Sequence, residues 1–65
     1  MKNFISVVIP SFNEEKNIAR CIESVFETLR EITKYEVIVV DSFSNDKTIE
    51  IAKNYPVNII RLKKA

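Results

Sequence analysis

Three short apolar runs alternate with two stretches of helical pattern, and this alternation constrains the fold more than any other feature of the chain. The runs are residues 4–9, 35–40 and 57–62, and they are rich in Val and Ile, which are typical of β-strands. The order strand–helix–strand–helix–strand predicts two βαβ units and a three-stranded parallel sheet. Right-handed crossovers then give the strand order 3-2-1, with both helices on one face.

The two helical stretches have an apolar side that predicts how they pack. In the first, apolar residues recur at steps of four and three, namely Ile18, Ile22, Val25, Leu29 and Ile32. We predict Asn13 as the N-cap of this helix, because its side chain can accept a hydrogen bond from a free backbone N–H. We expect the second helix to begin near Ser44 or Asn45 and to end at Pro56. Its predicted inward side chains are Ile49, Ala52 and Tyr55.

Both faces of the predicted sheet are apolar. In the first run Val7 and Ile9 would point to one face, whereas Phe4 and Val8 would point to the other. Strands of this kind belong to sheets covered on both faces, but two helices on one side cover only one. We therefore expect residues 1–65 to be the opening part of a larger domain. We also expect the isolated chain to form a homo-oligomer through the uncovered face and the open strand edge.

Composition excludes several classes of function. The 65 residues include no Gly, which excludes phosphate-binding loops of the Walker and GxGxxG types. With no His and only Cys21, His-based triads and the usual zinc sites are excluded too. The net charge of +1 argues against a nucleic-acid partner, and no apolar run approaches the roughly 20 residues of a transmembrane helix. Because Cys21 has no disulfide partner in the chain, we predict a cytoplasmic location, with Cys21 buried beside the apolar stripe.

Polar and aromatic residues follow the first two predicted strands at the edge where parallel sheets bind ligands. After the first strand, Pro10 restricts the turn and Phe12 offers an aromatic face on which a base could stack. After the second strand, Asp41 could accept hydrogen bonds from a ribose or from base N–H groups. Each residue also has a structural interpretation: Phe12 could pack on the helix, and Glu14 is an ordinary acid for a first helical turn.

Two segments of the chain together resemble the N-terminal nucleotide-sugar-binding part of family 2 glycosyltransferases. They read ISVVIPSFNEEKNIARCIESV and YEVIVVDSFSNDKTIEIAKNYPVNIIRL. The family typically has P-[ST]-[YF]-N-E after the first strand and V-D-D-G-S-x-D-x-T at the end of the second. The resemblance implies a GT-A-type, Rossmann-like α/β fold and transfer of a sugar from a UDP- or GDP-linked donor, with inversion at the anomeric carbon. It also implies that the intact parent could lie at the cytoplasmic face of a membrane.

Carried over by position, the resemblance implies a set of donor-binding residues. Two positions depart from the family pattern, since Ser42 stands where a second acid is common and Phe43 stands where Gly is common. The first departure removes an expected base-contacting carboxylate, and the second fills space that Gly would leave open. The implied donor-binding residues are Pro10, Phe12, Asn13, Glu14, Val40, Asp41 and Ser42.

The resemblance assigns no catalytic residue and no metal ligand to this chain. In the family, the metal-binding D-x-D element and the catalytic base lie further along. A divalent metal, Mg or Mn, is thus implied for the intact enzyme, while this chain alone is expected to bind none and to be inactive. Two alternatives stay open, namely part of another Rossmann-like nucleotide enzyme and a non-catalytic α/β interaction module. The first would need a Gly-rich phosphate turn, which residues 10–15 do not supply.

Overall fold

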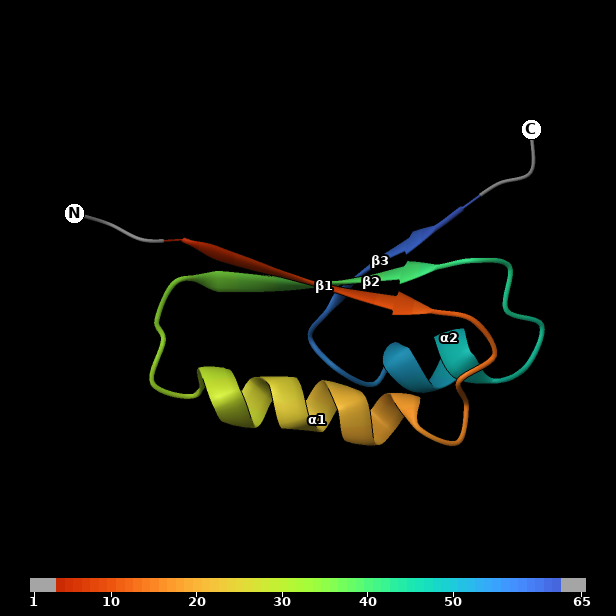
Figure 1. The fold of residues 1–65 in the computed structure, drawn as a ribbon, viewed down its shortest axis with the longest axis horizontal. Helices are drawn as coiled ribbons and strands as arrows, with labels where there is room; N and C mark the ends of the chain where they lie inside the picture. The colour runs from red at the N-terminus through yellow and green to blue at the C-terminus, as the bar shows by residue number, and fades with distance from the viewer. Residues whose placement is uncertain (1–3, 63–65) are drawn as a thin grey trace.

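The structure, a computed structural model, describes residues 4–62 and forms one parallel sheet with two helices (Figure 1). The strands lie in the order β1-β2-β3, which confirms the predicted α/β class and strand order. Both helices lie on the same side of the sheet, as right-handed crossovers require. The elements are β1 (Ile5–Ser11), α1 (Ile18–Leu29), β2 (Tyr35–Asp41), α2 (Thr48–Ala52) and β3 (Asn58–Arg61).

The register of the sheet places the ends of β1 and β2 level with each other. Ile5 pairs with Tyr35 at one end of the two strands, and Ser11 pairs with Asp41 at the other. The segments that leave the two strands at this edge therefore start side by side. β3 is shorter and pairs with the second half of β2, ending where Arg61 lies beside Asp41.

The core lies between the sheet and the helices. Val39 and Ile22 have no exposed surface, so β2 and α1 meet in a dry interior. Full burial of an aliphatic side chain of this size contributes about 1.5–3 kcal/mol, which makes this layer the main source of stability. The buried core consists of Ile9, Ile18, Ile22, Leu29, Val37, Val39 and Ala52.

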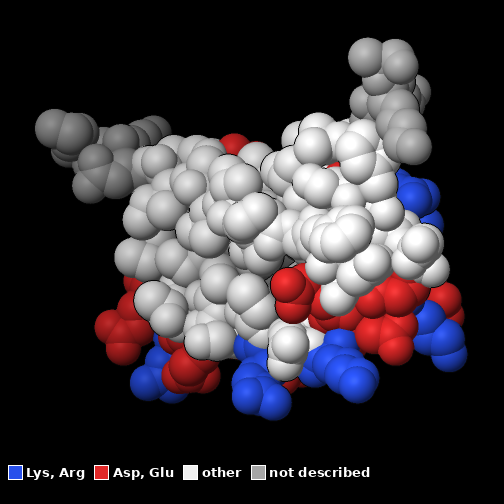
Figure 2. Space-filling model, turned by 45° about the vertical axis from the view of Figure 1, so that its right-hand side comes forward, with Lys and Arg blue, Asp and Glu red and all other residues white. Residues whose placement is uncertain are grey.

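The opposite face of the sheet is uncovered in the part of the chain that the structure describes. The strands occupy the upper part of Figure 2, which is mostly white, whereas charged side chains gather over the helices. Val8 is 56% exposed and Ile60 is 50% exposed, and each lies on the face opposite the core. We call this surface the open face; it is formed by Phe4, Val8, Ile38, Val40, Ile60 and Leu62.

The start of α1 differs from the sequence prediction. The helix begins at Ile18, and Asn13 is not its N-cap. Asn13 instead has a φ of 49° and accepts a hydrogen bond from the backbone N–H of Asn45, 2.9 Å away. The preceding turn is closed by Glu14, whose carbonyl accepts hydrogen bonds from the N–H groups of Asn17 and Ile18. The prediction was wrong because the Asn13 side chain has a partner in the neighbouring loop.

The second helix is also shorter than predicted. It begins at Thr48, whose N–H donates a 2.9 Å hydrogen bond to the carboxylate of Asp46 in the preceding loop. Ile49 and Ala52 are buried as expected. Tyr55 lies beyond the helix, half-buried, and its hydroxyl donates a 2.6 Å hydrogen bond to Glu23 of α1.

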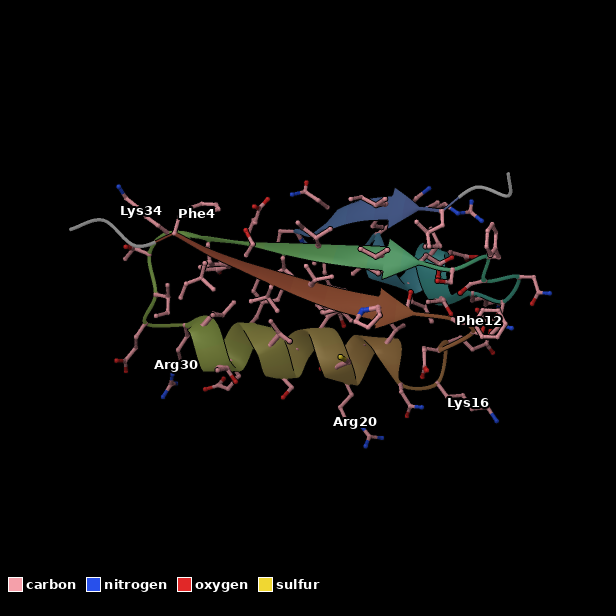
Figure 3. The ribbon with its side chains drawn as sticks, turned by 45° about the horizontal axis from the view of Figure 1, so that its top comes forward. Phe4, Phe12, Lys16, Arg20, Arg30 and Lys34 are labelled. Atoms are coloured by element: carbon pink, nitrogen blue, oxygen red, sulfur yellow. The ribbon has the colours of Figure 1, made fainter. Side chains whose placement is uncertain are left out.

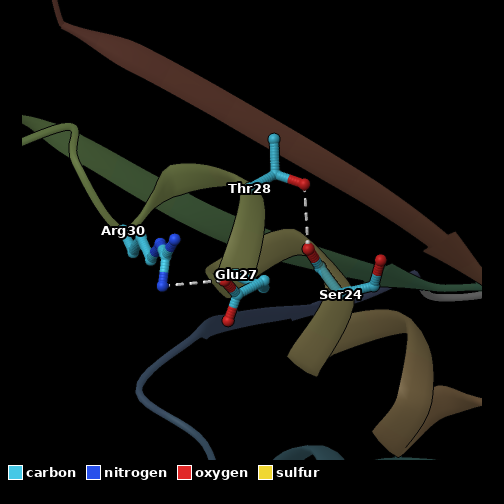
Figure 4. Close-up of polar contacts among 4 residues, drawn as sticks. All are labelled: Ser24, Glu27, Thr28 and Arg30. Carbon is cyan, nitrogen blue, oxygen red and sulfur yellow. Dashed lines mark hydrogen bonds and ion pairs between the residues drawn. The ribbon is translucent and has the colours of Figure 1, made fainter.

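The far end of α1 is held by local contacts on the surface (Figure 4). The Thr28 hydroxyl donates to the Ser24 carbonyl at 3.0 Å, and Arg30 lies 3.2 Å from the carboxylate of Glu27. Both members of this ion pair are 69% exposed, so the pair adds little to stability. Within residues 4–62, neither helix is long and apolar enough to cross a bilayer.

Candidate functional site at the ends of β1 and β2

Asp41, the last residue of β2, is fully buried and accepts hydrogen bonds from both sides. The Ser11 hydroxyl, at the end of β1, donates to its Oδ1 at 2.8 Å, and the Ser44 hydroxyl donates to the same oxygen. The Ser44 backbone N–H donates to Oδ2 at 2.9 Å. The carboxylate of Asp41 therefore joins the two chain segments that leave the sheet at this edge.

These contacts keep Asp41 ionised at neutral pH. Burial by itself raises the pKa of a carboxyl group, because it disfavours the charged form. At Asp41 this effect is outweighed by the hydrogen bonds from the side chain and N–H of Ser44, the hydrogen bond from Ser11 and the nearby charge of Arg61. The pKa of Asp41 therefore lies below the ordinary value of 3.8.

A second group of hydrogen bonds joins the loop after β1 to the loop after β2. We call residues 12–17 the first loop and residues 42–47 the second loop. The Asn13 N–H donates to the Ser44 hydroxyl at 2.8 Å, and the Asn45 N–H donates back to Asn13 Oδ1 at 2.9 Å. The Glu14 N–H donates to the hydroxyl of Thr48 at 2.7 Å. Backbone groups of each loop are thus satisfied by side chains from the other segment.

The outer part of the two loops is joined in the same way. The Glu15 N–H donates to Asp46 at 3.3 Å, and the Lys47 N–H donates to Glu15 at 2.9 Å. Burial raises the pKa of Asp46, but the hydrogen bonds from Thr48 and from the Glu15 N–H lower it by more. The pKa of Asp46 therefore lies below 3.8. The bonds reach from the strand ends to the surface, and the two loops form one connected edge.

Each loop presents an exposed aromatic ring at this edge. Phe12 is 57% exposed and Phe43 is 44% exposed. Their backbone positions lie between the same two hydrogen bonds that join the loops, from the Ser42 N–H to the Ser11 carbonyl and from the Asn13 N–H to the Ser44 hydroxyl. Figure 3 shows Phe12 beyond the end of β1, at the opposite end of the molecule from Phe4.

A pocket of about 280 Å³ adjoins the first loop, between β1 and the start of α1. Cys21 is exposed there, so the prediction that it is buried was wrong. It lies one residue before the buried Ile22 and so falls on the edge of the apolar stripe. The lining residues are Ile9, Pro10, Glu14, Asn17, Ile18 and Cys21.

The predicted donor-binding residues all lie at this edge but differ in accessibility. Pro10, Phe12, Asn13 and Glu14 are exposed, and Val40 and Ser42 are half-buried. Direct contact of Asp41 with a ligand stays a prediction, and it requires the carboxylate to exchange a bond to Ser11 or Ser44 for one to the ligand.

Sequence reasoning did not foresee the hydrogen bonds that hold the two loops together. Ser11, Ser44 and Thr48 are buried and supply hydroxyls to the other loop or to Asp41. Short side chains with hydroxyl groups stand near two aspartates in this part of the sequence. This composition is typical of loops whose side chains form hydrogen bonds to backbone groups, and it could have indicated these contacts.

We also searched the described residues for clusters of side chains that bind metals. Within residues 4–62, no three His, Cys, Asp or Glu side chains lie close enough together to hold a metal ion. The divalent metal that the resemblance implies for the intact enzyme stays a prediction.

Comparisons with known proteins identify the family. The model of glycosyl transferase family 2 matches residues 6–65, and the chain belongs to this family. It is 45% identical over 51 residues to a dolichyl N-acetyl-alpha-D-glucosaminyl phosphate 3-beta-D-2,3-diacetamido-2,3-dideoxy-beta-D-glucuronosyltransferase of Methanococcus voltae, covering 78% of this chain and 16% of that protein. It is 46% identical over 52 residues to glycosyltransferase AglE of Haloferax volcanii, covering 80% of this chain and 17% of that protein. It is 36% identical over 64 residues to dolichol-phosphate mannosyltransferase of Pyrococcus furiosus, covering 92% of this chain and 18% of that protein.

These matches confirm the predicted resemblance to a family of glycosyltransferases. The matched region spans only 16–18% of the length of these relatives.

Proposed function

We propose that this chain forms part of the donor site of a glycosyltransferase that transfers a sugar from a UDP- or GDP-linked donor, with inversion at the anomeric carbon. The observation that carries the proposal is the connected edge at the ends of β1 and β2. There, two loops with family 2 residues are held together by Asp41 and by bonds between side chains and backbone. Family membership supports the sugar-transfer class.

The site residues have different parts in this proposal. Pro10, Phe12, Asn13 and Glu14 are exposed and available for contact with the nucleotide, as are the half-buried Val40 and Ser42. Asp41 acts chiefly as a positioning residue, because its buried charge fixes both loops relative to each other. The metal and the catalytic base would come from other parts of the intact enzyme.

The proposal extends to location and assembly. The exposed thiol of Cys21, which forms no disulfide, supports a reducing and therefore cytoplasmic environment. The open face supports a homo-oligomeric state for the isolated chain, since a second copy would remove Val and Ile side chains from water.

We expect nucleotide binding to map to residues 10–14 and 40–42. In a titration of the labelled chain with UDP and GDP, the amide shifts of these two segments should change together, since they belong to one connected edge. The affinity should be weak, about millimolar, because we expect the contacts to diphosphate, metal and sugar to come from other parts of the intact enzyme. Shifts confined to residues 57–62 would contradict the proposed site.

We expect the 65-residue chain alone to transfer no sugar, with or without added Mg or Mn. The described residues contain no metal ligand set, and an inverting transfer needs a base that deprotonates the acceptor. The measurement is release of nucleoside diphosphate from UDP- and GDP-sugars in the presence of candidate acceptors, compared with a buffer blank. Turnover above that blank would show that catalytic groups lie within this chain.

A further inference from the structure

Phe43 adopts a backbone conformation that a bulky residue rarely adopts. Its φ is 64°, in the left-handed region, where a side chain with a Cβ crowds its own backbone. The chain contains no Gly, and its other left-handed residue among residues 4–62 is Asn13, a type that tolerates this region. Strained residues of this kind gather at functional sites, where the surrounding structure holds them in place.

The ring of Phe43 is not explained by packing. Its side chain is 44% exposed, and Phe43 is absent from the core cluster and from the residues packed against it. Within residues 4–62, the one close aromatic pair is Phe26 with Tyr35, on the core side of the sheet. Phe43 thus takes a strained conformation and keeps much of its apolar ring in water.

The position of Phe43 matches that of Phe12 on the neighbouring loop. Hydrogen bonds from Ser42 to Ser11 and from Asn13 to Ser44 lie on either side of the pair, so the two rings leave the same edge from opposite loops. The bonds that join the two loops also fix the backbone that carries both rings. Two exposed rings carried by a fixed backbone at the end of a parallel sheet suit a flat ligand.

The polar groups beside Phe43 are poorly suited to reading the edge of a base. Asp41 is buried and already accepts three hydrogen bonds, and Ser42 carries no charge. The second loop therefore offers no free carboxylate next to the strand end that could accept a base N–H. A base held there would be held mainly through its flat face.

We propose that Phe43 is a specificity-determining residue that stacks on the nucleobase of the donor, with Phe12 contributing from the first loop. This inference rests on the proposed function and adds a physical basis for the selectivity of the site among nucleotides. Stacking is tolerant of base identity because every base has a π-face, and it strengthens with ring area. The site then selects purine over pyrimidine nucleotides and distinguishes poorly between guanine and adenine.

The test is a titration of the labelled 65-residue chain with GDP, ADP and UDP at one salt concentration, with dissociation constants taken from amide shifts. We expect GDP and ADP to bind within about threefold of each other and about fivefold or more tighter than UDP. Phe43→Gly should weaken the binding of GDP and ADP about tenfold, and Phe43→Tyr should not, because Tyr keeps the ring.

The choice of variants distinguishes weaker binding caused by the loss of stacking from weaker binding caused by unfolding. Gly is the residue that best accepts a positive φ, so Phe43→Gly should keep a dispersed amide spectrum. Phe4→Leu is the matched control, because Phe4 is an exposed phenylalanine at the opposite end of the molecule, and it should leave all three affinities unchanged.

The outcomes distinguish this inference from the function on which it rests. Binding of GDP that Phe43→Gly leaves unchanged would overturn the stacking role alone, as would tighter binding of UDP than of GDP and ADP. Absence of any nucleotide binding by the unmodified chain would overturn the proposed function and this inference with it.

Discussion

Replacing Asp41 by Ala should remove most of the stability of the isolated chain. The substitution leaves the Ser11 hydroxyl, the Ser44 hydroxyl and the Ser44 N–H without their buried acceptor. Each orphaned donor costs about 1–3 kcal/mol, whereas a domain of this length has only about 3–10 kcal/mol in total. Urea unfolding followed by circular dichroism measures the loss. Glu31→Gln, at an exposed carboxylate, is the control and should change stability by less than about 0.5 kcal/mol.

The same side chain predicts the response to acid. The folded-state pKa of Asp41 lies below 3.8, so the stabilisation from its charge is fully present above the unfolded-state pKa. It is lost as pH falls through the folded-state pKa, in the range below about 4. The stability difference between the unmodified chain and Asp41→Asn should therefore shrink as pH is lowered from 7 to below 4. A difference that stays constant over this range would contradict the structural role of the ionised carboxylate.

The isolated chain should self-associate through the open face at micromolar concentration. If roughly 300–400 Å² of apolar surface per copy is left in water, its burial would provide about 8–10 kcal/mol per copy as an upper bound. For two copies this upper bound is about 15–20 kcal/mol, which exceeds the association cost of about 4–15 kcal/mol, so a dimer is expected at micromolar concentration. The edge of β1, which pairs only with β2 among the described strands, offers further hydrogen bonds to a second copy.

Analytical ultracentrifugation of the unmodified chain and of two charge variants tests this association. Val8→Lys places a charge in the middle of the open face and should give a folded monomer. Ser24→Lys adds the same charge at an exposed position of α1 and should remain a dimer. A folded, strictly monomeric species of the unmodified chain would show that the open face does not drive assembly.

The architecture could be predicted from the sequence because its main determinants are periodic. Alternation of apolar residues in the first run put Val7 and Ile9 on one face of the sheet and Phe4 and Val8 on the other. In the structure, Val7 and Ile9 lie on the core side, whereas Phe4 and Val8 are exposed. The strand order followed from right-handed crossovers that run in one direction. Neither inference needed any knowledge of side-chain contacts between distant segments.

The helix starts and the structure of the site could not be predicted in the same way. Asn13 has the chemistry of an N-cap, but its side chain bonds to the N–H of Asn45, 32 residues away. The charge of Asp41 suggested exposure to a ligand, whereas the hydroxyls of Ser11 and Ser44 allow it to be buried. In both cases the structure depends on a hydrogen-bond partner that is distant in the sequence. The residues around a short polar side chain do not indicate which distant group it will bond to.

The register of the sheet has a consequence for the order of events in folding. Every pair between β1 and β2 joins residues 30 apart, nearly half of the chain, and the bonds between the loops span a similar separation. β1 and β2 can therefore pair only once the 30-residue separation between them, which contains α1, has been closed. High contact order of this kind slows the search for the native state, because the chain loses loop entropy before any pairing compensates for it. We therefore expect the edge that holds Phe12 and Phe43 to form late, because it depends on the pairing of β1 with β2.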